Sequence, residues 1–262
     1  MSCITLRAFR KIMLEQDALE TLEGHISVRA AIEGRSRPIE RLLIREGILN
    51  KSAHALLRLA QDENVPFERV PESVIEEYTS GNTHGGVLAI VGPRHVLPLA
   101  DLAADQANPL IIMLDGHEDP FNFGQAVRSI YAAGAHGLVL RPRQWTTATA
   151  VVARSSAGAY ERIPLAFADT AEDAVAHFRS RGLNAVALDA DSKAQTIYAY
   201  DWSQPTFALI GGEKRGLSRG LAKQVDAVLQ LPYGRDFRRS LGMSPTAAVV
   251  AFEAMRQRLG NS

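Results

Sequence analysis

The chain has 262 residues, of which 46% are hydrophobic, and its 29 basic residues balance its 29 acidic ones. This length can bury one large core or two modest ones, and the neutral net charge excludes a general attraction to nucleic acid, so any such partner must be met by a local patch. Cys3 is the only cysteine, which excludes disulfide frameworks and cysteine-based zinc sites and fits a reducing cytoplasm, while no apolar run has the length of a membrane span or the character of a signal peptide.

The first part of the chain is expected to hold a helical arm followed by a small α/β domain. Apolar residues recur at roughly helical spacing from Leu6 to Leu19, which predicts a helix over residues 1–24 that ends at Gly24. Residues 25–95 then alternate between helical and strand patterns, as is typical of a small α/β domain. The predicted helices are 28–33 and 53–63, and the predicted strands are 39–44, 67–70 and 87–91.

Arginines that cluster between residues 35 and 45 are this domain's strongest indication of an RNA partner. They are Arg35, Arg37, Arg41 and Arg45. Glutamates are interleaved with them, so a solvated surface of mixed charge is the competing interpretation. Our candidate RNA contacts in this domain are Arg35, Arg37 and Arg41.

A boundary near residue 100 is expected to separate this domain from a second one. Gly92-Pro93 closes the first domain, residues 96–108 are expected to form a linker with a short helix over 97–108, and residues 109–262 show a second alternation. Strand patterns followed by helical patterns predict a parallel sheet covered by helices. The predicted strands are 110–114, 137–140, 184–188, 206–210 and 227–231, and the predicted helices are 124–133, 148–153 and 171–181.

The stretch from Leu209 to Ser218 is the most conspicuous loop of the second domain. An apolar strand ends there in a turn with glycines at positions 211, 212 and 216. α/β proteins place such turns against ligands at the carboxyl edge of a sheet. The glycine spacing matches a P-loop, but Leu217 stands where the phosphate-binding lysine is required, and no G-x-G-x-x-G is present. The loop therefore predicts a site for a ligand other than the usual nucleotides, with a tight structural turn as the alternative.

The chain is expected to end in a helix that follows an arginine-rich loop. Ser244 is the predicted cap, Pro245 suits the first turn, and apolar residues continue from Ala247 to Leu259. The preceding loop places three arginines near the helix N-terminus, where backbone amides already favour anions. They are Arg235, Arg238 and Arg239, which are candidate RNA contacts, with plain solvation as the alternative.

Three segments, each at the end of a predicted strand, together match a family pattern. Asp119-Pro-Phe-Asn-Phe-Gly-Gln-Ala-Val-Arg128 resembles the first signature of the SpoU/TrmH family of SPOUT RNA methyltransferases. Gly211-Gly-Glu-Lys-Arg-Gly216 resembles the second, and Leu231-Pro232 with Ser240-Leu241 resembles the third. Thr83-His-Gly-Gly-Val87 is weakly similar to the end of the small RNA-binding domain that often precedes the catalytic one in this family.

The resemblance implies an α/β SPOUT methyltransferase domain over residues 109–262, with a parallel sheet and a trefoil knot, preceded by a small α/β RNA-binding domain. It implies S-adenosylmethionine as the cofactor, a homodimer whose active site uses both subunits, and structured rRNA or tRNA as the substrate. The implied reaction is transfer of a methyl group to a ribose 2′-hydroxyl in the cytoplasm, without a metal and away from membranes.

The resemblance also assigns roles to particular residues. Arg128 takes the place of the family's catalytic arginine, and we expect it to hold a phosphate and stabilise the developing alkoxide, not to act as a base, because arginine stays protonated in proteins. The implied catalytic residues are Asn122, Arg128, Glu213 and Ser240. The implied cofactor-binding residues are Ile210, Gly211, Gly212, Leu231, Ser240, Leu241 and Met243.

Each of these roles has a structural alternative. Asn122 is suited to cap a helix that starts near Phe123, and Ser240 is also a common capping residue. Glu213 fits an ordinary loop salt bridge, and Arg128 fits a surface arginine paired with an acid. A dense polar group precedes the first signature, and we interpret it as a loop and not as a metal site. It consists of Asp115, His117, Glu118 and Asp119.

Gly242 departs from the family pattern, which usually has Asn directly after Ser-Leu. Glycine supplies no side-chain hydrogen bond, so one support of the catalytic loop is missing. A protein of the same fold that binds cofactor and RNA but has lost catalysis therefore stays open, as does methylation of a base. Because Asn tolerates positive φ better than most residues, we expect Gly242→Asn to fold and to methylate at least as fast as the parent.

Overall fold

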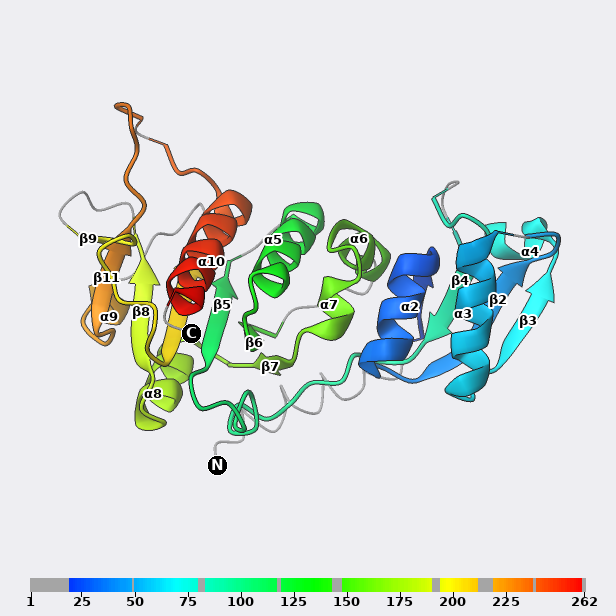
Figure 1. The fold of residues 1–262 in the computed structure, drawn as a ribbon, viewed down its shortest axis with the longest axis horizontal. Coiled ribbons are helices and arrows are strands. Elements are labelled where there is room, and N and C mark those ends of the chain that lie inside the picture. Colours follow the sequence, from blue (N-terminus) through cyan, green and yellow to red (C-terminus); the bar gives the residue numbers. More distant parts are fainter. Residues whose placement is uncertain are drawn as a thin grey trace. The chain divides into compact units, whose positions relative to one another are not determined.

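The computed structural model describes residues 19–48, 50–79, 83–116, 119–142, 148–189, 194–211, 219–237 and 239–260, with the backbone only at residue 219. Contacts divide this part of the chain into two compact units, whose elements are labelled in Figure 1. The N-terminal unit contains the described residues up to His95 together with 148–162. The second unit contains the described residues of 96–142 and 163–260. Residues 148–162 thus pack with the N-terminal unit although they lie far along the chain, within the range expected for the methyltransferase domain.

The N-terminal unit is built on a four-stranded sheet in the order β1-β4-β2-β3. β4 pairs antiparallel with β1 and β2, and β2 pairs parallel with β3. The predicted strands over 39–44, 67–70 and 87–91 are confirmed as β2, β3 and β4. The strands are β1 (Glu20–Glu23), β2 (Ile39–Arg45), β3 (Phe67–Val70) and β4 (Val87–Val91). The helices of this unit are α2 (His25–Gly34), α3 (Lys51–Asp62), α4 (Glu72–Glu76), α6 (Thr149–Ser155) and α7 (Ala159–Arg162).

Strand β1 corrects the expectation of a helical arm over residues 1–24, of which 1–18 lie outside the described residues. All five residues of β4 are buried, so its backbone groups need hydrogen-bonding partners on both sides, and β1 supplies one of them. Leu22 is fully buried beneath the sheet, whereas the residues on either side of it are only partly buried. Leu22 therefore belongs to a half-buried strand and not to a helical stripe.

The second unit is built on a seven-stranded sheet in the order β7-β6-β5-β10-β8-β11-β9. Every pairing in it is parallel. The parallel sheet covered by helices is therefore confirmed, with β7 and β9 as strands that the sequence did not indicate. The strands are β5 (Leu110–Asp115), β6 (Gly137–Leu140), β7 (Leu165–Phe167), β8 (Asn184–Leu188), β9 (Gln195–Thr196), β10 (Thr206–Gly211) and β11 (Ala227–Gln230).

Helices cover this sheet on both faces. Phe178 of α8 stacks on Phe207 of β10 with ring centroids 4.7 Å apart, within a buried cluster that also holds Leu209. Because side chains alternate along a strand, Ala208 and Ile210 face the other way, where α10 packs against α5 and β10, as Figure 1 shows for the red and green helices. The helices are α5 (Pro120–Ala132), α8 (Ala171–Ser180), α9 (Arg219–Ala222) and α10 (Met243–Leu259).

The linker helix expected over residues 97–108 is wrong. This segment forms turns, with Leu97 bridging to Ala166 and Leu102 buried completely in the core of the second unit. Ala103 has a φ of 51°, a left-handed conformation that cannot continue a right-handed helix. Burial of Leu102 thus selects an irregular path over the helix that the local pattern favoured.

Candidate functional site

The strands that precede the three predicted motifs are β5, β10 and β11. All three end at the carboxyl edge of the parallel sheet in the second unit. β5, β6 and β7 follow one another in one direction, whereas β8 and β10 lie on the other side of β5, so the order reverses between β5 and β10. Gly211 at the end of β10 is in register with Asp115 at the end of β5. Ligands of open α/β sheets bind at such a reversal, outside the carboxyl ends of the strands.

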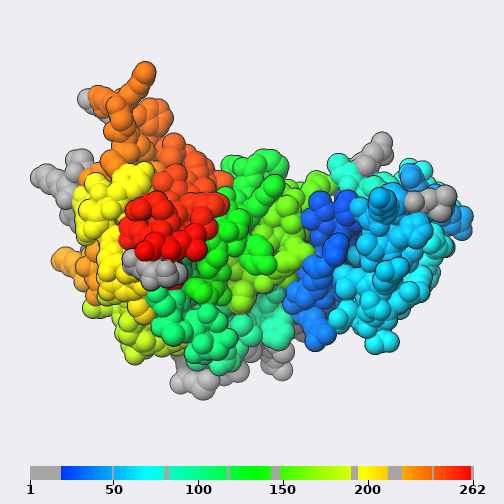
Figure 2. All heavy atoms as spheres, viewed as in Figure 1, coloured from blue at the N-terminus to red at the C-terminus, as the bar shows by residue number. Residues whose placement is uncertain are grey.

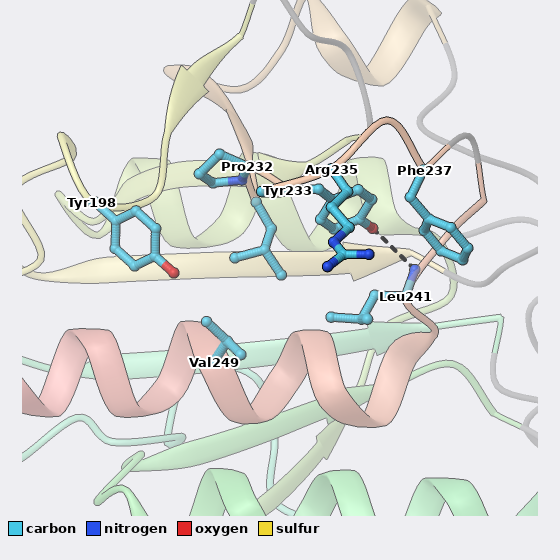
Figure 3. Close-up of a pocket in the computed structure, with 9 residues that line it drawn as sticks. Tyr198, Pro232, Tyr233, Arg235, Phe237, Leu241 and Val249 are labelled. Carbon is cyan, nitrogen blue, oxygen red and sulfur yellow. Dashed lines mark hydrogen bonds between the residues drawn. The ribbon is translucent and has the colours of Figure 1, made fainter.

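A pocket of about 500 Å³ lies near this edge, between the segment after β11 and helix α10. Its lining brings together Leu231 and Leu241, which lie ten residues apart in sequence and which the third signature assigned to the cofactor. Figure 3 shows Phe237 and Leu241 near one end of the pocket and Tyr198 at the other. The lining residues are Tyr198, Leu231, Pro232, Tyr233, Gly234, Arg235, Phe237, Leu241 and Val249.

Two side chains hold the backbone of the segment between β11 and α10. The hydroxyl of Tyr233 accepts a hydrogen bond from the Leu241 amide at 3.0 Å, drawn as a dashed line in Figure 3. The Oγ of Ser240 accepts one from the Gly242 amide at 3.1 Å. Ser240 is exposed and supports the turn before α10, while Met243, the first residue of α10, is buried. Tyr233 therefore supplies a brace to the loop in which the family's usual asparagine is missing.

Gly242, and not Ser244, is the residue that precedes helix α10. Ser244 lies inside the first turn, and no side chain caps the helix. Gly242 has φ 91° and ψ 158°, a backbone conformation with positive φ. This ψ lies far from the left-handed helical region that Asn tolerates, in a region that only glycine occupies readily. The expectation that Gly242→Asn fits the loop is therefore revised, because an L-residue is strained there.

Helix α5 carries the first signature and begins earlier than the sequence indicated. Asp119 caps it by accepting a hydrogen bond from the Asn122 amide at 2.7 Å, so Asn122 is not the cap. The Asn122 side chain is exposed and is not needed for capping, which leaves it available for another role. Asp115 lies 3.4 Å from Arg141 in an exposed ion pair. The carboxylate of Asp115 is thus already paired with a cation, and that of Asp119 already accepts a backbone hydrogen bond.

Arg128 is exposed on α5 and makes no ion pair with any residue that the structure describes. Because β5 and β6 are parallel neighbours, α5 must run from the carboxyl edge of the sheet back to its amino edge. Arg128 is eight residues beyond Pro120, or about 12 Å along the helix axis. The Cα of Arg128 is therefore well away from the edge where α5 begins. No α5 residue is among those described as lining the pocket.

The end of strand β10 has room for a ligand. Gly211 is exposed, and a Cβ built on it meets no atom of the described residues within 4 Å. Ile210 is buried in the core with 1% exposure, so only its backbone can face a ligand. Gly212 and Glu213 lie outside the described residues, and their predicted roles are not tested.

The predicted RNA contacts of the N-terminal unit are all paired with carboxylates. The prediction that Arg37 contacts RNA is wrong, because its side chain is only 1% exposed. Its guanidinium donates hydrogen bonds to both carboxylate oxygens of Glu161 at 3.0 Å and to Glu20 at 2.6 Å. Burial lowers the pKa of Arg37, but the attraction of Glu161 and Glu20 outweighs it and the net shift is upward. Arg35 and Arg41 stay on the surface, each in an exposed ion pair.

The arginines of the segment before α10 are in a different state. Arg235 and Arg239 are exposed and make no ion pair within the described part of the chain. Arg238 is not among the described residues. Tyr233 and Phe237 stand beside them with exposures of 39% and 53%, and our sequence reasoning missed both. The signal was present in Tyr233-Gly-Arg-Asp-Phe-Arg-Arg239, where aromatic residues alternate with arginines.

Metal and membrane sites receive no support from the part of the chain that the structure covers. Within it, no group of three histidine, cysteine or acidic side chains is arranged to hold a metal ion. His117 and Glu118, which belong to the dense polar group, fall outside it. None of the described helices combines the length and the apolar character needed to span a membrane.

Comparison with known families places both units. The model of the SpoU rRNA methylase family matches residues 109–252, and the model of the RNA 2′-O ribose methyltransferase substrate-binding domain matches residues 21–97. An uncharacterized tRNA/rRNA methyltransferase of Mycobacterium avium (strain 104) is 35% identical over 204 residues, which cover 77% of this chain and 65% of the relative. The chain thus spans about 65% of the length of the curated relatives that it matches.

Solved structures agree with this assignment. An rRNA methyltransferase from Sinorhizobium meliloti superimposes with a TM-score of 0.75 at 23% identity, covering 92% of this chain and 88% of the other, and shows a common fold. The SpoU methyltransferase AviRb from Streptomyces viridochromogenes, in complex with the cofactor AdoMet, has a TM-score of 0.71 at 26% identity, over 92% of this chain and 90% of the other. The chain therefore belongs to the SpoU rRNA methylase family.

Proposed function

We propose that this chain is an S-adenosylmethionine-dependent RNA methyltransferase that modifies a ribose 2′-hydroxyl of rRNA or tRNA. The observation that carries the proposal is the pocket near the carboxyl edge of the sheet, where Leu231 and Leu241 line one cavity. The matched substrate-binding region supports RNA as the partner, and its model names the 2′-hydroxyl of ribose as the acceptor. Such substrates also support the cytoplasmic location expected from the sequence.

The pocket residues fit S-adenosylmethionine. A cavity of about 500 Å³ has the size of a small-molecule site, and its lining is mainly apolar and aromatic. Open space at Gly211 lets a ligand approach the backbone at the end of β10. We propose that backbone groups of Ile210, Gly211 and Leu241, with Leu231 and Met243 beside them, hold the cofactor. The bound cofactor supplies a methyl group on a positively charged sulfonium.

The chain's own residues are proposed to position the hydroxyl and to stabilise its charge. The attacking ribose oxygen loses a proton and develops negative charge, so the site needs a fixed cation more than it needs a covalent nucleophile. The guanidinium of Arg128 makes no ion pair within the described part of the chain, and its geometry suits both a phosphate and an alkoxide. Asn122, which is free of capping, is proposed to orient that guanidinium. Ser240 acts through its hydrogen bond to the Gly242 amide.

We propose that a second copy of the chain completes the site. The pocket, as described, contains no residue of α5, and Arg128 is about 12 Å along α5 from the helix start. On α10, Phe252 and Leu259 are 42% and 66% exposed and lie seven residues apart, so they share a face. An α10 face of one copy packed on another would cover this apolar surface and bring in Arg128 of the partner. Light scattering tests it, and a fully active monomer would contradict it.

The trefoil knot is proposed from family membership. Unknotted chains are the rule among proteins, and neither strand order nor composition implies a knot. The position of β10 between β5 and β8 is compatible with it.

The proposed function is tested by turnover of labelled S-adenosylmethionine on total rRNA and tRNA. After nuclease digestion, label on the ribose supports the proposal, whereas label on the nucleobase contradicts the 2′-hydroxyl as acceptor. A second candidate, a cofactor- and RNA-binding protein without turnover, is favoured by Gly242 alone. Cofactor and RNA binding without any labelled product would select this second candidate.

The cofactor site is tested separately by calorimetry on Gly211→Arg. Since a Cβ at this position meets no neighbour among the residues that the structure describes, the substitution should leave the fold intact while the long side chain enters the ligand's space. We expect cofactor binding to be lost in Gly211→Arg and to be only weakened in Gly211→Ala. Equal affinity of Gly211→Arg and the parent would place the cofactor elsewhere.

A further inference from the structure

The segment between β11 and α10 exposes aromatic rings and arginines that have no ion-pair partner among the described residues. Phe237 is 53% exposed and Tyr233 is 39% exposed, and the two rings meet edge to face with centroids 5.9 Å apart. In the sequence, Arg235 and Arg239 lie two residues before and two residues after Phe237, and neither makes an ion pair within the described residues. In Figure 2 this segment, in orange, stands out from the surface around it. The ring of Phe237 is thus presented to solvent and not packed into the core.

Phe237 contrasts with two other phenylalanines of the same unit. Phe178 and Phe207 of the same unit are fully buried and stacked on each other. Tyr233 is held by its bond to the Leu241 amide, so the edge-to-face pair keeps Phe237 on a fixed support. A supported, half-exposed aromatic ring between cations is the arrangement by which proteins stack unpaired RNA bases and hold the adjoining phosphates.

We propose that Phe237 is a stacking platform for an unpaired base of the RNA substrate, and that Arg235 and Arg239 contact the flanking phosphates. This inference rests on the proposed function and deepens it, because it specifies a substrate with an unstacked nucleotide at the site. A paired base inside a helix does not offer its face to a side chain. The substrate therefore presents a loop, a bulge or a single strand to this segment.

The charge beside the ring favours RNA over the cofactor as the stacking partner. S-Adenosylmethionine carries a sulfonium, an ammonium and a single carboxylate and is a net cation, so arginines without an ion-pair partner among the described residues attract it less than they attract a polyanion. Phe237 also lies near one end of the pocket in Figure 3, on the projecting segment. Stacking on the cofactor's purine is the competing outcome of the experiment.

The experiment compares the parent, Phe237→Ala and Phe237→Trp in binding to two labelled RNA probes. One probe is a hairpin with an unpaired loop, and the other is a fully paired duplex of the same length. Phe237→Ala should weaken hairpin binding about tenfold and leave duplex binding unchanged, and Phe237→Trp should keep the parent affinity.

Salt dependence separates the two kinds of contact. Removal of a phosphate contact in Arg239→Ala should reduce the slope of log affinity against log salt by about 0.7, whereas loss of stacking in Phe237→Ala should leave the slope unchanged. Calorimetry with S-adenosylmethionine should give an affinity for Phe237→Ala within a few fold of that of the parent, because the ring lies near one end of the pocket. Loss of cofactor affinity with unchanged RNA affinity would assign the ring to the cofactor and overturn the proposal.

The remaining outcomes distinguish this inference from the proposed function. If the parent binds the hairpin and Phe237→Ala binds it equally well, only the stacking platform is refuted. If the parent binds neither RNA probe, RNA as the partner is refuted, and the platform with it.

Discussion

Two regions of this protein are rich in arginine but differ in whether the arginines form ion pairs with carboxylates. Between residues 35 and 45, each arginine has a glutamate partner, and Arg37 is buried between two of them. Between residues 235 and 239, the arginines that the structure describes are exposed and make no ion pair within its described part. A count of arginines thus does not identify an RNA surface. We propose that the state of the carboxylates around them is the better guide.

Paired and unpaired arginines differ in what they can offer RNA. An exposed pair must be broken before its guanidinium meets a phosphate, and the carboxylate left behind repels the polyanion. A buried pair such as Arg37 and Glu161 is costly to break, because an uncompensated charge stays in the interior. We therefore expect the buried Arg37 to contribute to stability and the exposed, paired arginines of the N-terminal unit to contribute little. The arginines between residues 235 and 239 are expected to contribute to RNA binding.

The largest effect is expected for Arg37→Ala. Removing Arg37 leaves Glu161 buried without its bidentate partner, and the free energy of unfolding should fall by about 3–5 kcal/mol. Chemical denaturation measures it. The exposed pair of Arg41 and Glu68 provides a matched control, since Arg41→Ala should change stability by less than about 1 kcal/mol. A variant Arg37→Ala that is as stable as the parent but binds RNA poorly would reverse our assignment.

Arg128→Ala should reduce methylation by a hundredfold or more, which corresponds to about 2.7 kcal/mol or more in the transition state. Cofactor affinity should stay within a few fold, because the guanidinium acts on RNA and on the developing charge. Arg128→Lys should rescue poorly, since an ammonium cannot make a bidentate contact. Single-turnover rates and calorimetry separate the two quantities, and full activity in either variant would remove Arg128 from the mechanism.

A smaller effect is expected for Gly242→Asn. At φ 91° and ψ 158°, an L-residue costs about 1–3 kcal/mol of strain, so the segment before α10 should shift and lose the two hydrogen bonds that hold it. We expect the single-turnover rate to fall, with the fold retained because the buried core lies elsewhere. A rate equal to or above that of the parent would restore our earlier expectation that asparagine fits this loop.

The smallest effect tests the comparison most directly. Arg41→Ala and Arg239→Ala each remove one exposed arginine, but only Arg239 lacks a carboxylate partner among the described residues. Arg239→Ala should lower the salt slope of RNA binding by about 0.7, and Arg41→Ala should change it by much less. Equal slopes for the two variants would show that an exposed ion pair with glutamate does not prevent an arginine from binding phosphate. Arg35 and Arg41 would then again be candidate RNA contacts.

Local sequence patterns determined most of the strands, most of the helices and the three motif segments. Alternating and continuous apolar runs located β5, β8 and β10 to within a residue, because burial of side chains is set by short-range periodicity. The approximate position of the pocket was also available, since Leu231 and Leu241 both follow from the third signature. Sequence reasoning failed for β1, whose strand form depends on the partner β4, far along the chain.

Tertiary structure alone decided the partners of the charges and the conformation of the glycine. Glu161 is 124 residues from Arg37 along the chain, and only the packing of residues 148–162 with the N-terminal unit brings them together. The backbone of Gly242 depends on how the Leu241 and Gly242 amides are held by Tyr233 and Ser240. Composition reports which charges and glycines a chain has, but ion pairing and backbone strain depend on distances in space, which folding sets between residues far apart in sequence.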